Sequence, residues 1–464
     1  MKKFICILIT VTLLAINAYA GNLEPGTAPG STMKTLDQIE PRIPIPGSDT
    51  AAGTFYISQS GSYYLTGDRQ CTSSGIYVTA DNVTIDLTGH TLTGSESGSG
   101  VGVYSAQNVE IRNGTVTGFV YGLYASSSGC QYMKIKNVRS LSNTYSGIYF
   151  PSSNNVIEDC TVCDNGSYLN YTTYGIRTSN DSRVSNCIVV DNGYQAGYEG
   201  TVGVYATYGI YCSSGSIVEN NVVSQNGDLA LNDVYAIYVG NGGRATGNVL
   251  RGNGNHCQAD VAGIANNSSG VLIQGNTLYD NAYTAEGQVT CIITGTGSTI
   301  SDNTLYYNGN SVQDSLVTAI SAGGGSAVTG NTCTYDGYYA TNSSVFGIDA
   351  DSGCKIKGNT LRHEGHNGCY NVYGIYTSYA AVVNENVVSN CGYNATGAVY
   401  GLRLYFGSAA TGNTSYFNGS GASGTVYGMY ISGTSLVDQN ACYSNNGTNL
   451  YAPSNCQIGL NIGL

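Results

Sequence analysis

A two-part signature that returns about every 27 residues constrains the fold of this chain more than any other feature. A short apolar phrase led by a small residue, Tyr208-Gly209-Ile210-Tyr211, recurs from Gly209 in steps of 27, 27, 28, 28, 28, 27, 27 and 27 residues. An asparagine follows in phase at positions 221, 248, 276, 303, 331, 359, 386, 413, 440 and 461. Two markers that stay in phase over so many periods indicate stacked structural repeats.

Composition and local pattern decide which kind of repeat this is. The chain has 64 Gly and 40 Tyr, and it is rich in Ser, Thr, Asn and Val, which favour strands and turns over helices. The segment 269–278 alternates apolar and polar residues over short runs, as expected for two or three short strands in each period. Propeller blades of about 40–45 residues are too long. The sequence therefore predicts an all-β, single-stranded parallel β-helix with one coil for each period.

The asparagine column has a structural explanation in such a fold. Stacking places equivalent residues about 4.8 Å apart, which is the spacing between neighbouring strands. A side-chain amide at that spacing can donate to the next coil and satisfy backbone groups of the turn. We therefore expect an inward-facing asparagine ladder.

The repeat also sets the predicted domain boundaries. Residues 1–20 have the basic start, the apolar run and the small-residue cleavage site of a signal peptide, which predicts an exported protein. Residues 21–50 hold five of the seven prolines and are expected to form a linker. Residues 51–74 are predicted to form a hairpin that caps the solenoid, since an uncapped strand edge aggregates. Residues 75–464 then form the β-helix, with about 15 rungs including the less even early ones.

Charge limits the classes of expected binding partner, and the cysteines raise the question of disulfides. The net charge is −12 with only 17 Lys and Arg, and no basic stripe is present, so nucleic acid is not an expected partner. No run beyond the signal peptide is long enough to cross a bilayer. Of the 15 cysteines, 14 lie in the mature chain. Cys160 and Cys187 occupy the asparagine column of adjacent rungs, where they either form a disulfide or stack as small buried groups, and Cys369 and Cys391 are a second candidate pair.

The repeated phrases Gly-Ile-x, Asn-x-[Val/Leu] and Asn-Gly resemble those of the right-handed parallel β-helix proteins of the pectin-lyase-like superfamily, over about residues 75–464. The resemblance implies a right-handed solenoid with three sheets. It also implies kinship with polysaccharide lyases, glycoside hydrolases, uronate epimerases and carbohydrate-binding modules. The periodic pattern is similar as well to NosD-like periplasmic proteins linked to copper. However, three methionines in the mature chain and four scattered histidines are a poor copper-ligand set, and no metal site is predicted.

The candidate catalytic residues lie in or near the column formed by the residue after the Ile of each signature. Because the Ile points inward, the side chains of this column must point outward. Asp349 and Asp351 lie about 7 Å apart on one strand, and Arg403 lies about 10 Å away, two rungs on. Paired carboxylates can hold Ca²⁺ or act as acid and base, so these three residues are the candidate catalytic group. The phrase around Asp349 resembles the Tyr-Gly-[Phe/Ile]-Asp-Pro-His-Asp box of mannuronan epimerases, but it lacks the Pro and His, and its second Asp comes one place early.

Aromatic residues of the same column are the candidate ligand-binding group. Outward tyrosines can bind the faces of sugars, or can pack on one another and cover the sheet. The candidates are Tyr211, Tyr238, Tyr376 and Tyr430, together with His366 in a loop phrase, Gly365-His366-Asn367-Gly368. The hydrolase pattern of the superfamily (Asn-Thr-Asp, Asp-Asp, Gly-His-Gly) does not occur.

These observations predict an extracellular, cell-surface or periplasmic β-helix that binds polysaccharide or builds a surface layer without catalysis and without a cofactor. The alternative is a polysaccharide lyase, glycoside hydrolase or uronate epimerase centred on Asp349, Asp351 and Arg403, with Ca²⁺ as cofactor if it is a lyase. A purely adhesive rod, which binds no glycan, is a third hypothesis. No oligomeric state follows from the sequence.

Overall fold

The computed structural model describes residues 42–126, 129–166, 171–194, 205–266 and 268–463. The predicted signal peptide and most of the predicted linker lie outside these residues. Within the described part the chain forms 47 strands and no helix, so no helix long and apolar enough to cross a membrane is found there. We describe the unit that begins at Ile43.

The strands belong to two parallel sheets, called sheet A (31 strands) and sheet B (16 strands). Sheet B consists of β3(Phe55–Ile57), β6(Ile76–Val78), β9(Ser99–Val103), β11(Tyr121–Ala125), β13(Ser146–Phe150), β16(Thr173–Thr178), β19(Ala206–Cys212), β22(Asp233–Val239), β25(Val261–Asn266), β28(Val289–Thr294), β31(Leu316–Ala322), β34(Ser344–Ala350), β37(Val372–Thr377), β40(Val399–Leu404), β43(Val426–Ile431) and β46(Thr448–Tyr451).

Sheet A consists of β1(Ile43–Ile45), β2(Ser48–Ala52), β4(Gly61–Leu65), β5(Arg69–Cys71), β7(Val83–Asp86), β8(Thr91–Thr93), β10(Val109–Thr117), β12(Lys134–Leu141), β14(Val156–Glu158), β15(Thr161–Cys163), β17(Arg183–Ser185), β18(Ile188–Val190), β20(Ile217–Glu219), β21(Val222–Ser224), β23(Arg244–Thr246), β24(Val249–Arg251), β26(Leu272–Gln274), β27(Thr277–Tyr279), β29(Thr299–Ser301), β30(Thr304–Tyr306), β32(Ala327–Thr329), β33(Thr332–Thr334), β35(Lys355–Lys357), β36(Thr360–Arg362), β38(Val382–Asn384), β39(Val387–Ser389), β41(Ala409–Thr411), β42(Thr414–Tyr416), β44(Leu436–Asp438), β45(Ala441–Tyr443) and β47(Gln457–Ile458).

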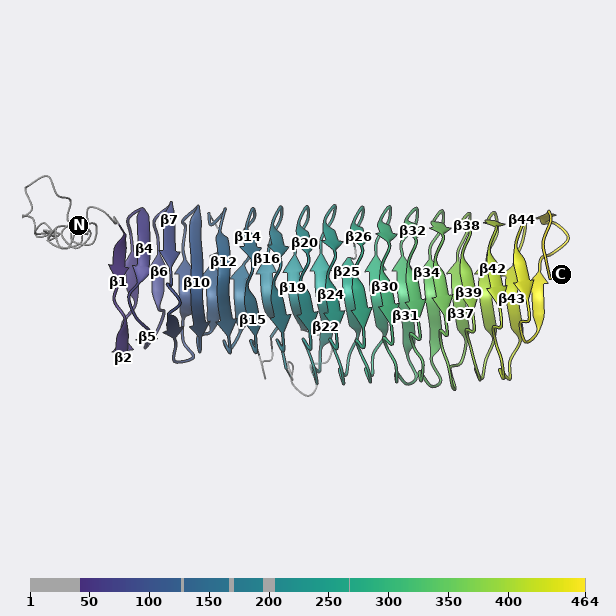
Figure 1. Ribbon diagram of the computed structural model, residues 1–464, viewed down its shortest axis with the longest axis horizontal. Coiled ribbons are helices and arrows are strands. Elements are labelled where there is room, and N and C mark those ends of the chain that lie inside the picture. The colour runs from purple at the N-terminus through teal and green to yellow at the C-terminus, as the bar shows by residue number, and fades with distance from the viewer. Residues whose placement is uncertain (1–41, 127–128, 167–170, 195–204, 267, 464) are drawn as a thin grey trace, which may run out of the picture. The chain divides into compact units, whose positions relative to one another are not determined.

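Each regular coil contributes two short strands to sheet A and one longer strand to sheet B, and the coils follow one another in sequence order (Figure 1). In one coil, β20, β21 and β22 pair in parallel with β23, β24 and β25 of the next. The first of the two residues between the sheet-A strands of a coil has positive φ, as at Asn220 (56°) and Gly247 (64°). Asn and Gly tolerate this left-handed conformation best, and it turns the chain at each corner. The predicted right-handed parallel β-helix is confirmed.

Two details at the start of the solenoid differ from the prediction. Sheet B has 16 strands, so the number of rungs differs slightly from the predicted value. The predicted hairpin cap is wrong, because β3 pairs in parallel with β6, and β4 pairs in parallel with both β1 and β7. Residues 43–74 therefore already form coils. Their alternating pattern suits a hairpin and a coil equally well, since both need strands with one buried face.

The core is a column of aliphatic side chains inside the coils. The Ile of the signature is fully buried at Ile210, Ile237 and Ile264. The small residue before it is required by close packing: a Cβ at Gly209 would lie 2.6 Å from the Ala236 carbonyl oxygen and 2.8 Å from Val223 Cγ1. Positions that lead the signature are therefore small because the neighbouring coil leaves no room for a larger side chain.

The predicted asparagine ladder is confirmed by its hydrogen bonds. Asn248 is typical: its backbone N–H and its Nδ2 both donate to Oδ1 of Asn276, at 2.9 and 3.0 Å. Nδ2 also donates to the carbonyl of Val218 at 2.9 Å. The same pattern links Asn221 to Asn461 down the solenoid. Each buried amide is thus satisfied by its neighbours, which makes the column structural.

A second asparagine ladder follows the C-terminal ends of β21 and of the equivalent strands in other coils. It was not predicted from the sequence. It includes Asn192, Asn226, Asn253, Asn281 and Asn308, again linked from Nδ2 to Oδ1. Several members precede a glycine, so the recurring Asn-Gly phrase was its signal. In its C-terminal part the ladder changes chemistry, because Asp336 and then Glu364 take the place of asparagine.

All 14 cysteines of the predicted mature chain are free thiols, and 12 of them are buried. Cys160 and Cys187 lie in the first ladder column, where the Cys187 N–H donates to Asn221 Oδ1 at 2.9 Å. Cys160 and Cys187 therefore stack as small buried groups and do not form a disulfide. The second candidate pair, Cys369 and Cys391, is likewise buried and unbonded.

Candidate functional site

The outward face of sheet B carries two parallel columns of aromatic side chains. The predicted column after the inward Ile is confirmed by strand register, in which Asp349 pairs with Tyr376, Tyr376 with Arg403, and Arg403 with Tyr430. A second column, three residues earlier in each strand, holds Tyr174, Tyr208, Tyr235, Phe346, Tyr373, Tyr400 and Tyr427. The two columns lie side by side and form one continuous face.

The columns form two separate aromatic patches. The N-terminal patch is centred on Arg177 and contains Tyr121, Tyr124, Tyr145, Tyr149, Tyr174, Tyr208, Tyr211, Tyr235 and Tyr238. The C-terminal patch is centred on Arg403 and contains Phe346, Tyr373, Tyr376, Tyr400, Tyr405, Tyr427, Tyr430 and Tyr451. The candidates Tyr211 and Tyr238 lie in the first patch, and Tyr376 and Tyr430 in the second.

Within each column most rings stack face to face. Tyr208 and Tyr235 have ring centroids 5.0 Å apart and planes 13° apart, and the corresponding values for Tyr211 and Tyr238 are 5.0 Å and 4°. Tyr373 and Tyr400 lie 5.3 Å apart at 3°. The coil spacing of about 4.8 Å sets this geometry, because it brings equivalent rings to stacking distance. An interior ring therefore has both faces covered and presents only its edge and hydroxyl to solvent.

Each patch holds its arginine by cation–π contacts. The Arg177 guanidinium lies 4.8 Å from the centre of the Tyr149 ring and 5.0 Å from that of Tyr174. Arg403 has five ring centres within 5.9 Å, the nearest being Tyr400 at 4.8 Å. It also donates from its terminal nitrogens to the hydroxyls of Tyr373 at 3.3 Å and Tyr405 at 2.8 Å. Aromatic rings rather than carboxylates thus surround both cations.

A gap of three coils separates the two patches. On β25, β28 and β31 the two outward columns hold small or aliphatic residues: Ala262 and Ala265, Thr290 and Ile293, Thr318 and Ser321. Tyr235 and Phe346 are the last and first aromatic residues of their column on either side, four coil spacings apart, which is about 19 Å. A cavity of about 170 Å³ lies at the N-terminal edge of this gap, between Tyr235 and Thr290.

The candidate catalytic residues lie at the C-terminal edge of the gap. Asp349 is half-buried on β34, and Asp351 is exposed just beyond the strand end. Burial, and then the neighbouring charge of Asp351, raise the pKa of Asp349 to about 6. Tyr376 separates Asp349 from Arg403 in the register, and no ion pair joins the two among the described side chains. The structure therefore brings the two carboxyls together and leaves the guanidinium with the tyrosines.

His366 is not a surface residue, contrary to what its loop position suggests. Its side chain is buried between the rings of Tyr338 (4.6 Å) and Tyr393 (5.1 Å). Its Nε2 lies 3.3 Å from the Asn390 carbonyl oxygen and 3.4 Å from His363 Nδ1. Burial and the neighbouring His363 lower the pKa of His366 to about 4, so it stays neutral at physiological pH. It packs as a third ring in an aromatic stack.

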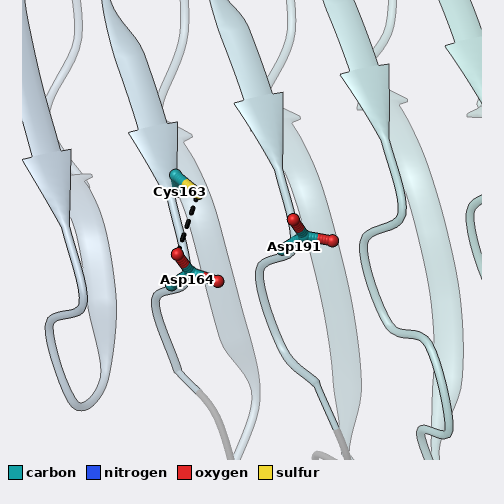
Figure 2. Close-up of side chains that lie close together, drawn as sticks. All are labelled: Cys163, Asp164 and Asp191. Carbon is teal, nitrogen blue, oxygen red and sulfur yellow. Dashed lines mark hydrogen bonds between the residues drawn. The ribbon is translucent and has the colours of Figure 1, made fainter.

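A group of metal-ligand type lies elsewhere, on the sheet-A side. Cys163 at the end of β15, with Asp164 and Asp191 after β15 and β18, places one ligand atom of each within 4.8 Å of the others (Figure 2). The Cys163 thiol donates to Asp164 Oδ2 at 3.0 Å. Burial and Asp164 raise the pKa of this thiol to about 12, so it keeps its proton. Cys160, three residues before Cys163, is not part of this group.

Comparison with known proteins supports the fold and leaves the activity open. A family model described as a right-handed beta helix region matches residues 74–253. No curated protein sequence matches the chain at a significant level.

Among solved structures, an alginate lyase from Paenibacillus sp. is 16% identical, with 56% of this chain and 97% of that chain covered and a TM-score of 0.35. A mannuronan C-5 epimerase A-module from Azotobacter vinelandii is 13% identical, with 81% and 89% covered and a TM-score of 0.32. A mannuronic acid-specific family 6 polysaccharide lyase from human gut microbiota is 10% identical, with 91% of each chain covered and a TM-score of 0.36. None of these similarities is high enough to indicate an activity.

Proposed function

We propose that this chain, whose fold is that of the right-handed parallel β-helix repeat proteins, is an exported module that binds polysaccharide on the outward face of sheet B without catalysis. The observation that carries the proposal is the pair of aromatic patches on that face, with a cavity where the N-terminal patch ends at Tyr235. Tyrosine combines a large apolar surface with a hydroxyl, and sugars present apolar C–H faces and many hydroxyls. The basic and apolar start at residues 1–20 supports export.

The electrostatics of the face suit binding better than chemistry. Burial raises the pKa of Tyr174 to about 12 and also raises that of Tyr208, so both hydroxyls remain protonated donors at neutral pH. Arg403 already donates to two phenol hydroxyls and lies among five rings. Its guanidinium is thus committed to positioning the aromatic residues. Such a surface offers hydrogen bonds and ring contacts, which is what a carbohydrate-binding module needs.

Binding is tested with protein that lacks residues 1–20 and a panel of neutral and uronate polysaccharides, by affinity electrophoresis or calorimetry. We expect saturable binding of at least one glycan, and binding that survives Asp349→Asn. Absence of binding to every glycan would contradict the proposal and favour a purely adhesive rod.

One observation favours the alternative of a polysaccharide lyase, hydrolase or epimerase: the pKa of Asp349 is raised to about 6 by burial and by Asp351. A half-buried carboxyl with this pKa can act as an acid or a base near neutral pH. The test is release of reducing or unsaturated ends, or C-5 epimerisation of uronates, with and without Ca²⁺. Turnover that Asp349→Asn abolishes, while glycan binding is retained, would establish the enzyme and overturn the non-catalytic proposal.

A further inference from the structure

We infer that the glycan site is the N-terminal edge of the gap between the two patches, where one neutral pyranose ring continues the tyrosine stack over Ala262. The inference deepens the proposed function and rests on it. It replaces the expectation that the tyrosine columns themselves bind sugar faces.

The first step is the availability of ring faces. A sugar packs its C–H face against the flat face of an aromatic ring, and a ring edge offers a smaller contact. Tyr208 is covered on one side by Tyr174 at 5.2 Å and on the other by Tyr235 at 5.0 Å. Tyr235 is the last ring of this column before the gap, and the register places Ala262 beside it on the next coil. The face of Tyr235 that points toward Ala262 has no ring against it.

The second step is the space beside that face. The cavity of about 170 Å³ is lined by Tyr235, Ala262, Thr290 and Ile293, with Asp260 and Gln288 on one side. Pockets for drug-sized ligands have roughly 300–1,000 Å³, so this cavity has room for about one sugar ring. Ala262 supplies the room, because its register neighbours on the preceding coils, Tyr208 and Tyr235, carry rings at the same position. A pyranose over Ala262 would therefore occupy the place of the next ring in the stack.

A second cavity occurs beside Tyr121, where Tyr104 and Tyr77 continue the aromatic contacts beyond Tyr124. Tyr121 pairs in register with Ser99 of the preceding coil, and a cavity of about 340 Å³ is lined by Ser99, Tyr104, Tyr121 and Tyr124. Here too, a small residue beside a tyrosine leaves a hollow, as Ala262 does beside Tyr235.

The third step is charge, which selects the class of sugar. Asp260 is exposed at the rim, and its Oδ1 accepts the Gln288 N–H at 2.7 Å. Asp233, on the preceding coil, accepts the Asp260 N–H at 3.2 Å, so a second carboxylate lies close to the one at the rim. The chain has a net charge of −12. A uronate would be repelled here, whereas the hydroxyls of a neutral pyranose can donate to the carboxylate oxygens.

The test compares the full mature chain with two variants, by calorimetry against neutral oligosaccharides of gluco, galacto and manno configuration and against oligouronates. Ala262→Tyr adds the missing ring and fills the cavity, and it should fold because the same register position carries Tyr on the two preceding coils. Tyr235→Leu removes the ring face that the sugar would contact. Tyr306→Leu, which removes one ring of the stacked Tyr279–Tyr306 pair on sheet A, outside the proposed binding face, is the matched control. We expect the first two variants to weaken binding of a neutral oligosaccharide at least 10-fold and the control to leave it within about twofold.

The outcomes separate the inference from the proposed function. If the unmodified chain binds a neutral glycan and both gap variants bind it equally well, the inferred site is wrong and the proposed function stands. If the chain binds only uronates, the inferred sugar class is wrong. If it binds no member of the panel, the proposed function fails and the inference fails with it. Loss of binding in Ala262→Tyr counts only with an unchanged circular dichroism spectrum and melting temperature, and Tyr235→Leu gives an independent check.

Discussion

The two aromatic patches use the same column positions on sheet B but differ in what lies at their edges and beneath them. The N-terminal patch ends at Ala262 and Ala265, beside a cavity that has Asp260 at its rim. The C-terminal patch begins at Phe346 and Asp349, where a carboxyl has a raised pKa. Identical stacking thus gives a site for a sugar ring at one edge and a titrating acid at the other. The chemistry of this face is set where the stacks are interrupted.

The layers below the patches differ in the same way. Under the N-terminal patch the second ladder is neutral, with Asn192, Asn226 and Asn253 satisfying one another. Under the C-terminal patch it contains Asp336 and Glu364, both fully buried. A Cβ on Gly347 of β34 would lie 3.4 Å from Glu364 Cγ, which places this acid directly beneath the strand that carries Asp349. The second ladder therefore contains ionisable side chains under the C-terminal patch and only amides under the N-terminal patch.

The largest expected effect comes from neutralising these two acids. Asp336 Oδ1 accepts two hydrogen bonds from Asn308, but Asp336 Oδ2 and both Glu364 oxygens have no protein partner among the described residues. Burial raises the pKa of Asp336 to about 7 and that of Glu364 well above its usual range. The folded state then holds protons that the unfolded state releases above about pH 4, so stability falls as pH rises, through about pH 7 for the Asp336 contribution.

Asp336→Asn combined with Glu364→Gln should remove this pH dependence and raise the unfolding free energy at pH 8 by about 2–4 kcal/mol. Urea denaturation at pH 5 and pH 8 measures the change. Because solenoid repeats interact mainly with their neighbours, hydrogen exchange at pH 8 should slow in the coils around residues 330–370 and stay unchanged around 200–250. Equal slowing in both regions, or equal pH dependence in the variant, would remove the proposed difference between the two halves.

A smaller effect is expected from the two arginines. Arg403 contacts five rings and donates two hydrogen bonds to phenols, whereas Arg177 has three rings within 5.7 Å and donates to Tyr149. We expect Arg403→Met to cost about 2–3 kcal/mol and Arg177→Met about 1–2 kcal/mol, since Met keeps the alkyl packing and removes the charge. Thermal or urea unfolding of the two variants gives the comparison. A larger loss of unfolding free energy in Arg177→Met than in Arg403→Met would show that the number of contacting rings does not determine how much the arginine stabilises its patch.

Much of this fold can be read from the sequence, because its markers repeat. The period, the inward Ile, the first asparagine ladder and the outward column from Tyr211 to Tyr430 were all predicted correctly. The second ladder was missed although its Asn-Gly phrases recur, since Asp336, Glu364 and Cys391 interrupt the series in its C-terminal part. Residues 51–74 were assigned to a hairpin because strand patterns do not state which strand is the partner.

The site was harder to predict than the fold for a geometric reason. Sequence spacing places tyrosines in one column, but it does not say whether their faces are open or covered. The coil spacing and the side-chain rotamers decide that, and they leave Tyr208 covered and Tyr235 open on one side. His366 is a similar case. Its loop phrase suggested exposure, but Tyr338 and Tyr393, each 27 or 28 residues away, enclose it.

The smallest expected effect tests the acid at the edge of the C-terminal patch. Asp351→Asn removes the charge that, after burial, raises the pKa of Asp349, so this pKa should fall from about 6 toward its ordinary value. Carbon-13 NMR of the Asp349 carboxyl across pH 3–8 would measure the shift. Since a raised pKa stabilises the fold below about pH 4 and loses that contribution as pH rises through about 6, Asp351→Asn should also make stability slightly less dependent on pH in this range. The effect should be well under that of the buried pair, because Asp351 is exposed and screened by water. If the pKa of Asp349 does not move, burial alone raises it, and the edge of the C-terminal patch holds a single desolvated acid rather than a coupled pair of carboxyls.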